Sequence, residues 1–186
     1  MLGRSALLFA LALTACDSSG VPPPGQEPLR ASSPQVEMDA VELRRDGLVA
    51  GPEAFYFAAG QNEVETALTS TLGEVLERSD NQECGGGPLE FVRFQGGLAV
   101  HFQRGSLVGW NISLPDEASE AVAQRVQVVG DVQVGTSKAD AIEADGFRLL
   151  PDSTLGEEFT LGDAMGGFMQ DARVTMLYAG AQCFFR

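Results

Sequence analysis

Three cysteines, Cys16, Cys84 and Cys183, constrain the fold of this chain more than any other residues. Cys16 directly follows an apolar leader, so Cys84 and Cys183 form an even pair in the rest of the chain. An even pair in an oxidising compartment favours a disulfide. Such a bridge would close a loop of about 100 residues and stabilise the fold by roughly 4–5 kcal/mol on the chain-entropy model. It would tie the middle of the chain to its C-terminal residues.

Two buried free thiols or a metal site are the alternatives for this cysteine pair. A structural zinc site needs about four cysteine or histidine ligands. The chain offers one histidine, His101, beside the two cysteines. We therefore predict a disulfide between Cys84 and Cys183, no metal and no cofactor.

Residues 1–15 have the composition of a secretory leader rather than of a folded element. Arg4 precedes an apolar run whose length is typical of a signal-peptide core and well short of the ~20 residues of a membrane-spanning helix. The run ends in "LTAC", which resembles the bacterial lipobox. The resemblance implies cleavage before Cys16, a diacylglycerol on its sulfur and acylation of the new amino terminus. An ordinary signal peptide followed by a coincidental cysteine is the alternative.

Several acyl chains on one residue hold a protein stably to a bilayer, whereas a single chain holds it only marginally. We therefore predict a lipid anchor on Cys16, in the inner or the outer membrane, with the protein facing the periplasm. Residues 16–35 are rich in proline and serine and lack apolar periodicity, which is typical of a spacer. The folded domain is predicted over residues 36–186.

The chain is strongly acidic, with 12 Lys+Arg against 26 Asp+Glu and a formal net charge of −14. Loss of the leader would remove Arg4 and no acid, which makes the charge balance more negative still. An acidic surface repels phosphate backbones and anionic headgroups. We therefore expect no nucleic-acid partner.

A faint internal repeat relates residues 55–68 to residues 131–144. Both segments show a short strand, a glycine, a polar residue suited to cap a helix, and a helix. Asn62 and Ser137 are the expected N-caps, each with an acidic residue three positions on. The apolar residues expected to face the core are Val64, Leu68 and Leu72 in the first helix, and Ala139 and Ile142 in the second.

Strand-like runs separated by turn residues follow each predicted helix. The predicted strands are 89–94, 98–103 and 107–112 in the first half, and 157–161, 166–170, 173–179 and 182–186 in the second. A helix capped by Ser113 and a strand over 126–134 would join the halves. The fold class is therefore α+β: two tandem modules of short helix plus antiparallel β-meander, about 36–112 and 126–186, joined by a helix and braced by one disulfide.

This pattern resembles the tandem modules of the β-lactamase inhibitory protein and the single module of the small lipoprotein of the outer-membrane barrel-assembly machine. The stretches "ECGGGPLEF", "GSLVGWNI", "STLGEEF" and "AGAQCFFR" also resemble a group of small, uncharacterised proteobacterial envelope lipoproteins. The resemblance implies a protein that binds other proteins and performs no chemistry.

The sequence offers little catalytic apparatus. Alternation places His101 opposite the apolar face of its strand, where we expect it in solvent. Glu157 and Glu158 are neighbours in a strand, so they point to opposite faces and do not share a site. Trp110 is expected in the core, with an exposed aromatic anchor as the alternative. Trp110 and His101 are thus weak candidates for partner contact, and no catalytic residue is predicted.

Together these features predict a membrane-anchored extracytoplasmic lipoprotein that is not an enzyme and that binds or scaffolds another envelope protein. A periplasmic module for an apolar small molecule is the first alternative. An atypical hydrolase, which would need a cleft joining His101 to a carboxylate, is the second.

Overall fold

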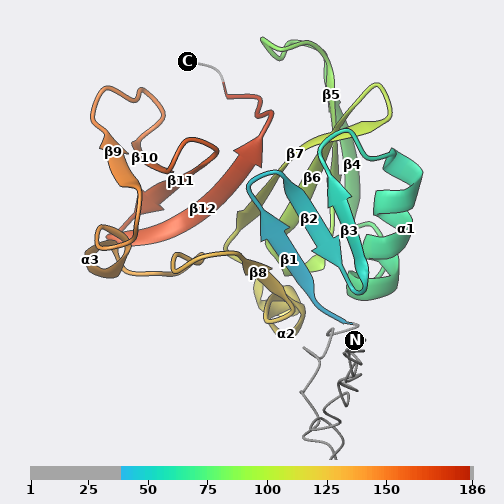
Figure 1. Ribbon diagram of the computed structural model, residues 1–186, viewed down its shortest axis with the longest axis horizontal. Helices are drawn as coiled ribbons and strands as arrows, with labels where there is room; N and C mark the ends of the chain where they lie inside the picture. Colours follow the sequence, from blue (N-terminus) through green and yellow to red (C-terminus); the bar gives the residue numbers. More distant parts are fainter. Residues whose placement is uncertain (1–38, 185–186) are drawn as a thin grey trace, which may run out of the picture. The chain divides into compact units, whose positions relative to one another are not determined.

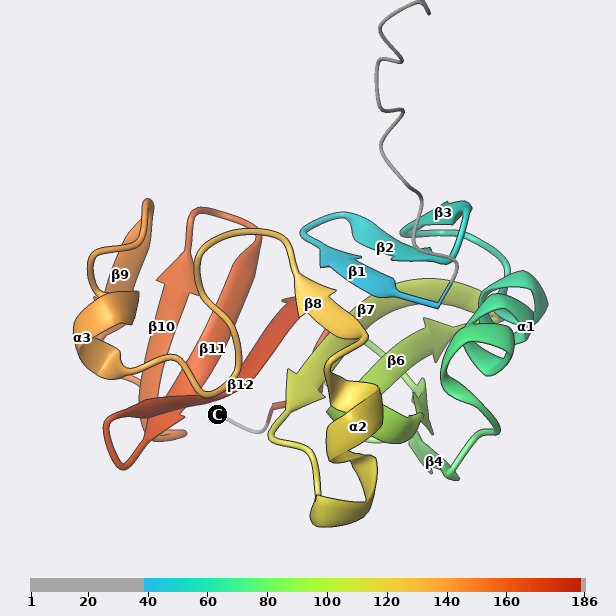
Figure 2. The ribbon, with the colours of Figure 1, turned by 90° about the horizontal axis from the view of Figure 1, so that it is seen from below.

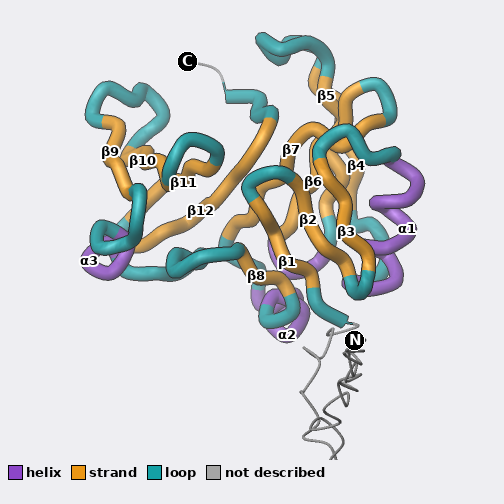
Figure 3. The backbone as a smooth tube through the Cα atoms, viewed as in Figure 1, coloured by secondary structure: helices purple, strands orange, loops and turns teal. Residues whose placement is uncertain are grey.

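The computed structural model describes residues 39–184, which form an α+β fold with two mostly antiparallel sheets (Figure 1). Strands dominate over helices in this part of the chain (Figure 3). The disulfide is present and joins Cys84 to Cys183, as predicted, with their Cα atoms 5.1 Å apart.

The small sheet has four strands in the order β3-β2-β1-β8. Its strands are β1 (Val41–Arg44), β2 (Gly47–Ala50), β3 (Glu53–Tyr56) and β8 (Val126–Val128). β8 is parallel to β1, and the other pairs are antiparallel.

The large sheet has eight strands in the order β4-β5-β6-β7-β12-β11-β10-β9, and all its pairs are antiparallel. Its first four strands are β4 (Glu77–Asn81), β5 (Leu89–Arg93), β6 (Leu98–Gln103) and β7 (Ser106–Ser113). Its last four are β9 (Phe147–Leu150), β10 (Glu157–Leu161), β11 (Met165–Gln170) and β12 (Arg173–Gly180).

The α-helices are α1 (Gln61–Leu72), α2 (Glu120–Ala123) and α3 (Lys138–Ala141). Short 3-10 turns cover Gln95–Gly97 and Glu117–Ser119. Figure 2 shows α1 beside the β4–β6 end of the molecule, α2 below β8, and α3 beside β9.

Helix α1 buries the face that the sequence predicted, because Val64, Leu68 and Leu72 recur at helical spacing. It ends at Gly73, whose φ of 96° lies in the left-handed region that glycine tolerates. The predicted cap Asn62 is wrong, because Gly60 occupies the N-cap position in an extended conformation. Gly60 is held there by a bridge to Ser106, so the helix begins before Asn62.

Helix α3 is capped by Ser137 as predicted, since its hydroxyl accepts from the backbone N–H of Asp140. The predicted buried face is wrong. Ala141 is the fully buried residue, and Ile142 is 48% exposed. The helix is one turn long, so a repeating apolar face never develops.

The connecting helix starts later than predicted, and Ser113 is instead the last residue of β7. Asp116 caps the first turn by accepting from the N–H of Ser119. Pro115 explains the delay, because the residue before a proline is disfavoured in helical conformation. Leu114 therefore cannot continue a helix that begins at Ser113.

The predicted strands 98–103 and 157–161 match β6 and β10. The predicted strand 126–134 is shorter in the structure, because β8 ends at Val128. The predicted strand 182–186 is wrong over its described residues, which have no regular structure. That segment is held by side chains and a disulfide rather than by a strand ladder.

One apolar core lies between the large sheet on one side and the small sheet and helices on the other. Trp110 sits in this core with no exposed surface. Its indole N–H donates to the carbonyl of Arg44 on β1, at 2.8 Å. Trp110 therefore joins the two sheets, and the core interpretation of this residue is confirmed.

Candidate functional site: the open face of the large sheet

The large sheet has a second face, which points away from the small sheet and helices. Successive side chains of a strand point to opposite faces of the sheet. The neighbours of the core residues Val92, Val100 and Leu177, and the residues paired with those neighbours, therefore lie on this second face. We call this surface the open face; it carries Ser79, Phe91, Arg93, Ala99, His101, Asn111, Ser113, Glu158, Phe168, Met176 and Tyr178.

His101 lies on the open face, but it is fully buried, so its predicted exposure is wrong. Its Nδ1 lies 2.8 Å from the carbonyl oxygen of Ala181, and its Nε2 lies 3.0 Å from Nδ2 of Asn111. A neutral imidazole satisfies both contacts, with Nδ1–H donating to the carbonyl and Nε2 accepting from the amide. Phe91 closes one side of the ring at a centroid distance of 4.7 Å.

Burial lowers the pKa of His101, because the charged imidazolium loses its hydration, and the hydrogen bond to Ala181 opposes this only in part. Both ring nitrogens are engaged by the protein itself. His101 therefore acts as a structural residue and is not available to a partner. The same holds for Trp110, so neither residue is the partner contact that the sequence suggested.

The C-terminal segment 180–184 buries His101 by crossing the open face. Gly109 leaves the room for it, because a Cβ there would lie 2.5 Å from the carbonyl oxygen of Ala181. Gln182 donates to the carbonyls of Trp110 and Ala179. The next residue, Cys183, is bonded to Cys84, so backbone, side chain and disulfide all fix this segment.

Three aromatic rings, Phe168, Tyr178 and Phe184, pack together on the open face beside this segment. Their centroids lie 5.1–5.7 Å apart, in tilted and edge-on arrangements that aromatic pairs favour. All three are partly exposed. Because Phe184 follows Cys183 directly, the disulfide also holds one ring of this group in place.

Glu158 is buried next to the aromatic group. It accepts from the hydroxyl of Tyr178 at 2.7 Å and from that of Ser153 at 2.5 Å. Its neighbour Glu157 is partly exposed and pairs with Lys138. The two glutamates therefore lie on opposite faces of β10, as predicted, and do not form a carboxylate pair.

A pocket of about 360 Å³ opens on the β4–β7 end of the open face. Leu76 and Leu114 both line it, and both are 53% exposed. Phe91 and Arg93 also line it, and Arg93 pairs with Glu77 at 2.8 Å. The remaining lining residues are Ser79, Phe94, Gly97, Ala99, Asn111, Ser113, Asp116 and Ser119.

Three further cavities lie elsewhere. One of about 420 Å³ is lined by Arg45 and by residues 129–132, 144–146 and 161–165. One of about 530 Å³ lies between α1 and residues 50–53, and one of about 620 Å³ borders α2 and β8. Neither His101 nor Glu158 lines any of these four cavities. The structure thus does not bring His101 and a carboxylate together in one of these clefts.

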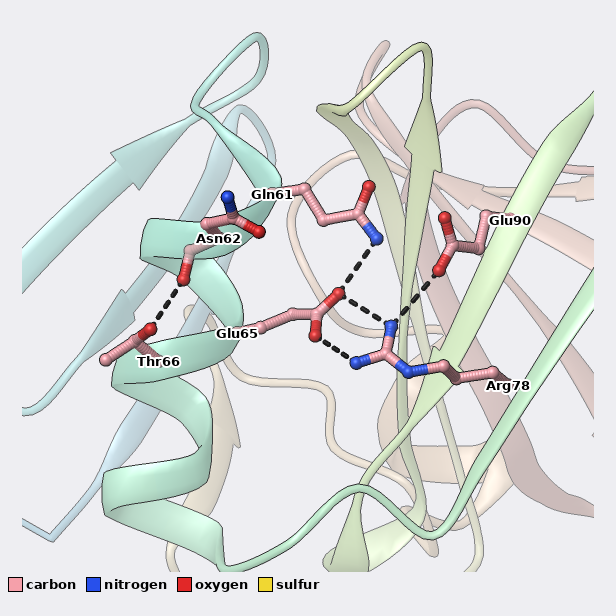
Figure 4. Close-up of polar contacts among 6 residues, drawn as sticks. All are labelled: Gln61, Asn62, Glu65, Thr66, Arg78 and Glu90. Carbon is pink, nitrogen blue, oxygen red and sulfur yellow. Dashed lines mark hydrogen bonds and ion pairs between the residues drawn. The ribbon is translucent and has the colours of Figure 1, made fainter.

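Helix α1 is braced to the edge of the large sheet by a charged cluster (Figure 4). Arg78 on β4 donates to both carboxylate oxygens of Glu65 on α1 and to Glu90 on β5. Gln61 also donates to Glu65. The hydrogen bond from Arg78 lowers the pKa of Glu65, and partial burial opposes that shift. Glu65, the acidic residue expected to take part in the cap of α1, instead binds that helix to the large sheet through Arg78.

Within residues 39–184, no group of three or more His, Cys, Asp or Glu side chains is placed to hold a metal ion. Over the same residues, no helix combines the length and the apolar character that a bilayer crossing requires. Cys16 and the predicted leader and spacer lie outside the described residues.

Comparisons with known proteins give no assignment: a scan against models of protein families and searches of curated proteins and of solved structures find no match.

Proposed function

We propose that this protein is a membrane-anchored extracytoplasmic lipoprotein that binds or scaffolds another envelope protein and performs no catalysis. Its contact surface is the open face of the large sheet. The pocket at the β4–β7 end carries the proposal, because two half-exposed leucines and Phe91 surround it. Exposed leucines and an aromatic ring beside polar side chains at a concavity are typical of a protein-binding site.

The open face is also rigid, which favours binding because little order has to be gained when a partner docks. The disulfide and the hydrogen bonds to Ala181 and from Gln182 fix the segment that crosses the face. Phe184 holds the aromatic group at the end of that segment. A partner would therefore meet a surface already in its final shape.

The proposal includes the tandem plan expected from the sequence, with one module before the connecting helix and one after it. The large sheet supports it, because β4–β7 and β9–β12 are two four-stranded runs that meet at β7 and β12. A second parallel is local. Gly60, before α1, bridges to Ser106 at the start of β7, and Ser137, before α3, bridges to Arg173 at the start of β12.

The pocket is tested with the lipid-anchored protein extracted from its native envelope in mild detergent. The variant Leu76→Glu/Leu114→Glu places two charges on the pocket rim, and Val129→Glu changes a similarly exposed residue that does not line it. We expect a stoichiometric partner to co-purify with the wild type and with Val129→Glu, and to be lost from the double variant. Equal retention by all three forms would remove the pocket from the interface.

The anchor is tested separately. Intact mass and N-terminal peptide mass spectrometry of the membrane fraction should show a chain that begins at an acylated Cys16. Cys16→Ser should release the protein from the membrane fraction. A chain that keeps residues 1–15, or that begins elsewhere without lipid, would refute the lipoprotein assignment while leaving the pocket test intact.

A further inference from the structure

The pocket at the β4–β7 end of the open face, which we call the β4–β7 pocket, lies between two exposed leucines from different strands. Leu76 directly precedes β4 and Leu114 directly follows β7, and β5 and β6 separate these two strands in the sheet. Neighbouring strands lie about 4.8 Å apart, so β4 and β7 are roughly 14 Å apart, a distance that about four residues of extended peptide span. The pocket therefore suits a short segment of chain rather than a single side chain.

The Leu76 end of the β4–β7 pocket carries more negative than positive charge. Arg93 is the one basic residue among those that line the pocket, and Glu77 pairs with it at 2.8 Å. Glu74, two residues before Leu76, is exposed, and within residues 39–184 it forms no ion pair. Because the Arg93–Glu77 pair is neutral as a whole, Glu74 leaves this end of the pocket negative.

The Leu114 end of the pocket is more acidic still. Asp116 and Ser119 line the pocket, and Glu117 and Glu120 flank Ser119 in sequence. The three acidic residues are exposed, and none of them forms an ion pair in the described part of the chain. The next basic residue along the chain, Arg125, donates to a carbonyl of α1 instead. Carboxylates therefore stand at both ends of an apolar concavity.

We propose that the β4–β7 pocket binds a basic segment of another envelope protein, in which apolar side chains lie between lysines or arginines. The apolar side chains of that segment pack between Leu76 and Leu114, over the small residues Gly97, Ala99 and Ser113 that line the pocket. Its cationic side chains face the carboxylates at the two ends. This inference rests on the proposed function, because it names the chemistry of the partner at the same pocket.

Charge complementarity favours this occupant over the others that an apolar concavity could take. A second copy of the chain would bring the same acidic ends against each other in a twofold contact, where like charges repel. The carboxylates also repel anionic lipid headgroups. An apolar small molecule would fill the pocket without using its charges. A basic segment with apolar side chains is the occupant that uses both the leucines and the carboxylates.

The chemistry of the segment is tested with a library of random octapeptides displayed on phage and with the immobilised full chain, extracted in mild detergent. Peptides selected on the wild type should be enriched several-fold in Lys or Arg and in Leu or Phe relative to the starting library. Leu76→Ser/Leu114→Ser keeps the charge of the protein and should remove the apolar enrichment. Glu117→Lys/Glu120→Lys should remove most of the basic enrichment.

The matched control for the charge reversal is Glu143→Lys/Asp145→Lys. It makes the same change in net charge at exposed positions that do not line the β4–β7 pocket, and it should leave the basic enrichment unchanged. A wild-type pool without basic enrichment would overturn the proposal. An equal loss of basic enrichment in the two charge-reversal variants would also overturn it, because the attraction would then come from the overall charge of the protein.

The native partner provides a second test, which separates this inference from the function on which it rests. Salt screens exposed charges, so the amount of co-purifying partner should fall several-fold between about 50 mM and about 500 mM NaCl. Glu117→Lys/Glu120→Lys should retain less partner than the wild type at the low salt concentration. A partner that requires both leucines, but that this variant retains at every salt concentration, would overturn the basic segment and leave the proposed function intact. A basic, apolar phage pool without any leucine-dependent partner in the envelope would overturn the proposed function instead.

Discussion

Single residues on the open face do structural work that their sequence positions conceal. The side chain of His101 points to the face of β6 opposite the apolar core, yet it is buried by a segment 80 residues away in sequence. The side chain of Glu158 on β10 is likewise fully buried, and it accepts hydrogen bonds from the hydroxyls of Ser153 and Tyr178. Both groups are expected to control stability rather than chemistry.

The lowered pKa of His101 predicts how stability depends on pH. The folded state keeps the imidazole neutral, whereas the unfolded chain binds a proton near pH 6.5. The contribution of His101 is thus fully present above about pH 6.5 and is lost as pH falls below it, with a slope of at most about 1.4 kcal/mol per pH unit. Urea denaturation of wild type and His101→Gln between pH 5 and 8, the latter expected to be flatter, measures it. Parallel pH profiles for the two proteins would contradict the assignment.

Tyr178→Phe tests the buried carboxylate. The change removes a hydroxyl that donates to Glu158 and leaves the ring in place. Loss of a hydrogen-bond donor to a buried carboxyl group should lower the free energy of unfolding by roughly 1–3 kcal/mol. Tyr56→Phe is the matched control, because Tyr56 is 61% exposed, and it should change stability little. Equal effects of the two variants in chemical denaturation would show that the hydrogen bond contributes nothing.

At the scale of elements, packing matters more than charge. Helix α1 is held by its buried apolar face and by the Arg78 cluster, but Arg78 is about half exposed, with 47% of its side chain accessible. Solvent-exposed ion pairs contribute little, because water and salt screen them and holding long side chains costs entropy. The apolar face should therefore determine whether the helix stays docked.

This comparison predicts unequal effects of two truncations. Leu68→Ala should destabilise the protein by about 2–5 kcal/mol, since Leu68 is completely buried. Arg78→Ala should cost no more than about 1 kcal/mol, and less in high salt. Thermal or urea unfolding of both variants at low and high ionic strength provides the measurement. An Arg78→Ala effect as large as that of Leu68→Ala would mean that the charged cluster dominates.

At the scale of the molecule, one covalent link joins two distant parts of the chain. The Cys84–Cys183 bridge connects the β4–β5 loop to the segment that crosses the open face. Residues 85–87 form the turn beside it, and the N–H of Gly87 donates to the carbonyl of Cys84. The bridge thus stabilises the fold and holds the proposed binding surface in shape.

Loss of the disulfide should lower stability by roughly 4–5 kcal/mol on the chain-entropy model. Cys84→Ser/Cys183→Ser compared with the wild type in urea denaturation, under oxidising and reducing conditions, checks this value. Reduced wild type should match the double variant. The amide exchange of residues 180–184 should rise in the variant, and a protected segment there would show that hydrogen bonds alone hold it.

The sequence by itself determined the local features of this protein. Alternation predicted β6, and a strand-like run between turn residues predicted β10. Helical spacing predicted the buried face of α1, and the even cysteine pair predicted the disulfide. Each of these signals depends on residues that are close together in sequence or on covalent chemistry. Only the tertiary structure decided that His101 is buried and that α3 is one turn long. Burial and helix length depend on which distant segment packs against a residue or a helix, and no local sequence pattern predicts that residues 180–184 cross the open face.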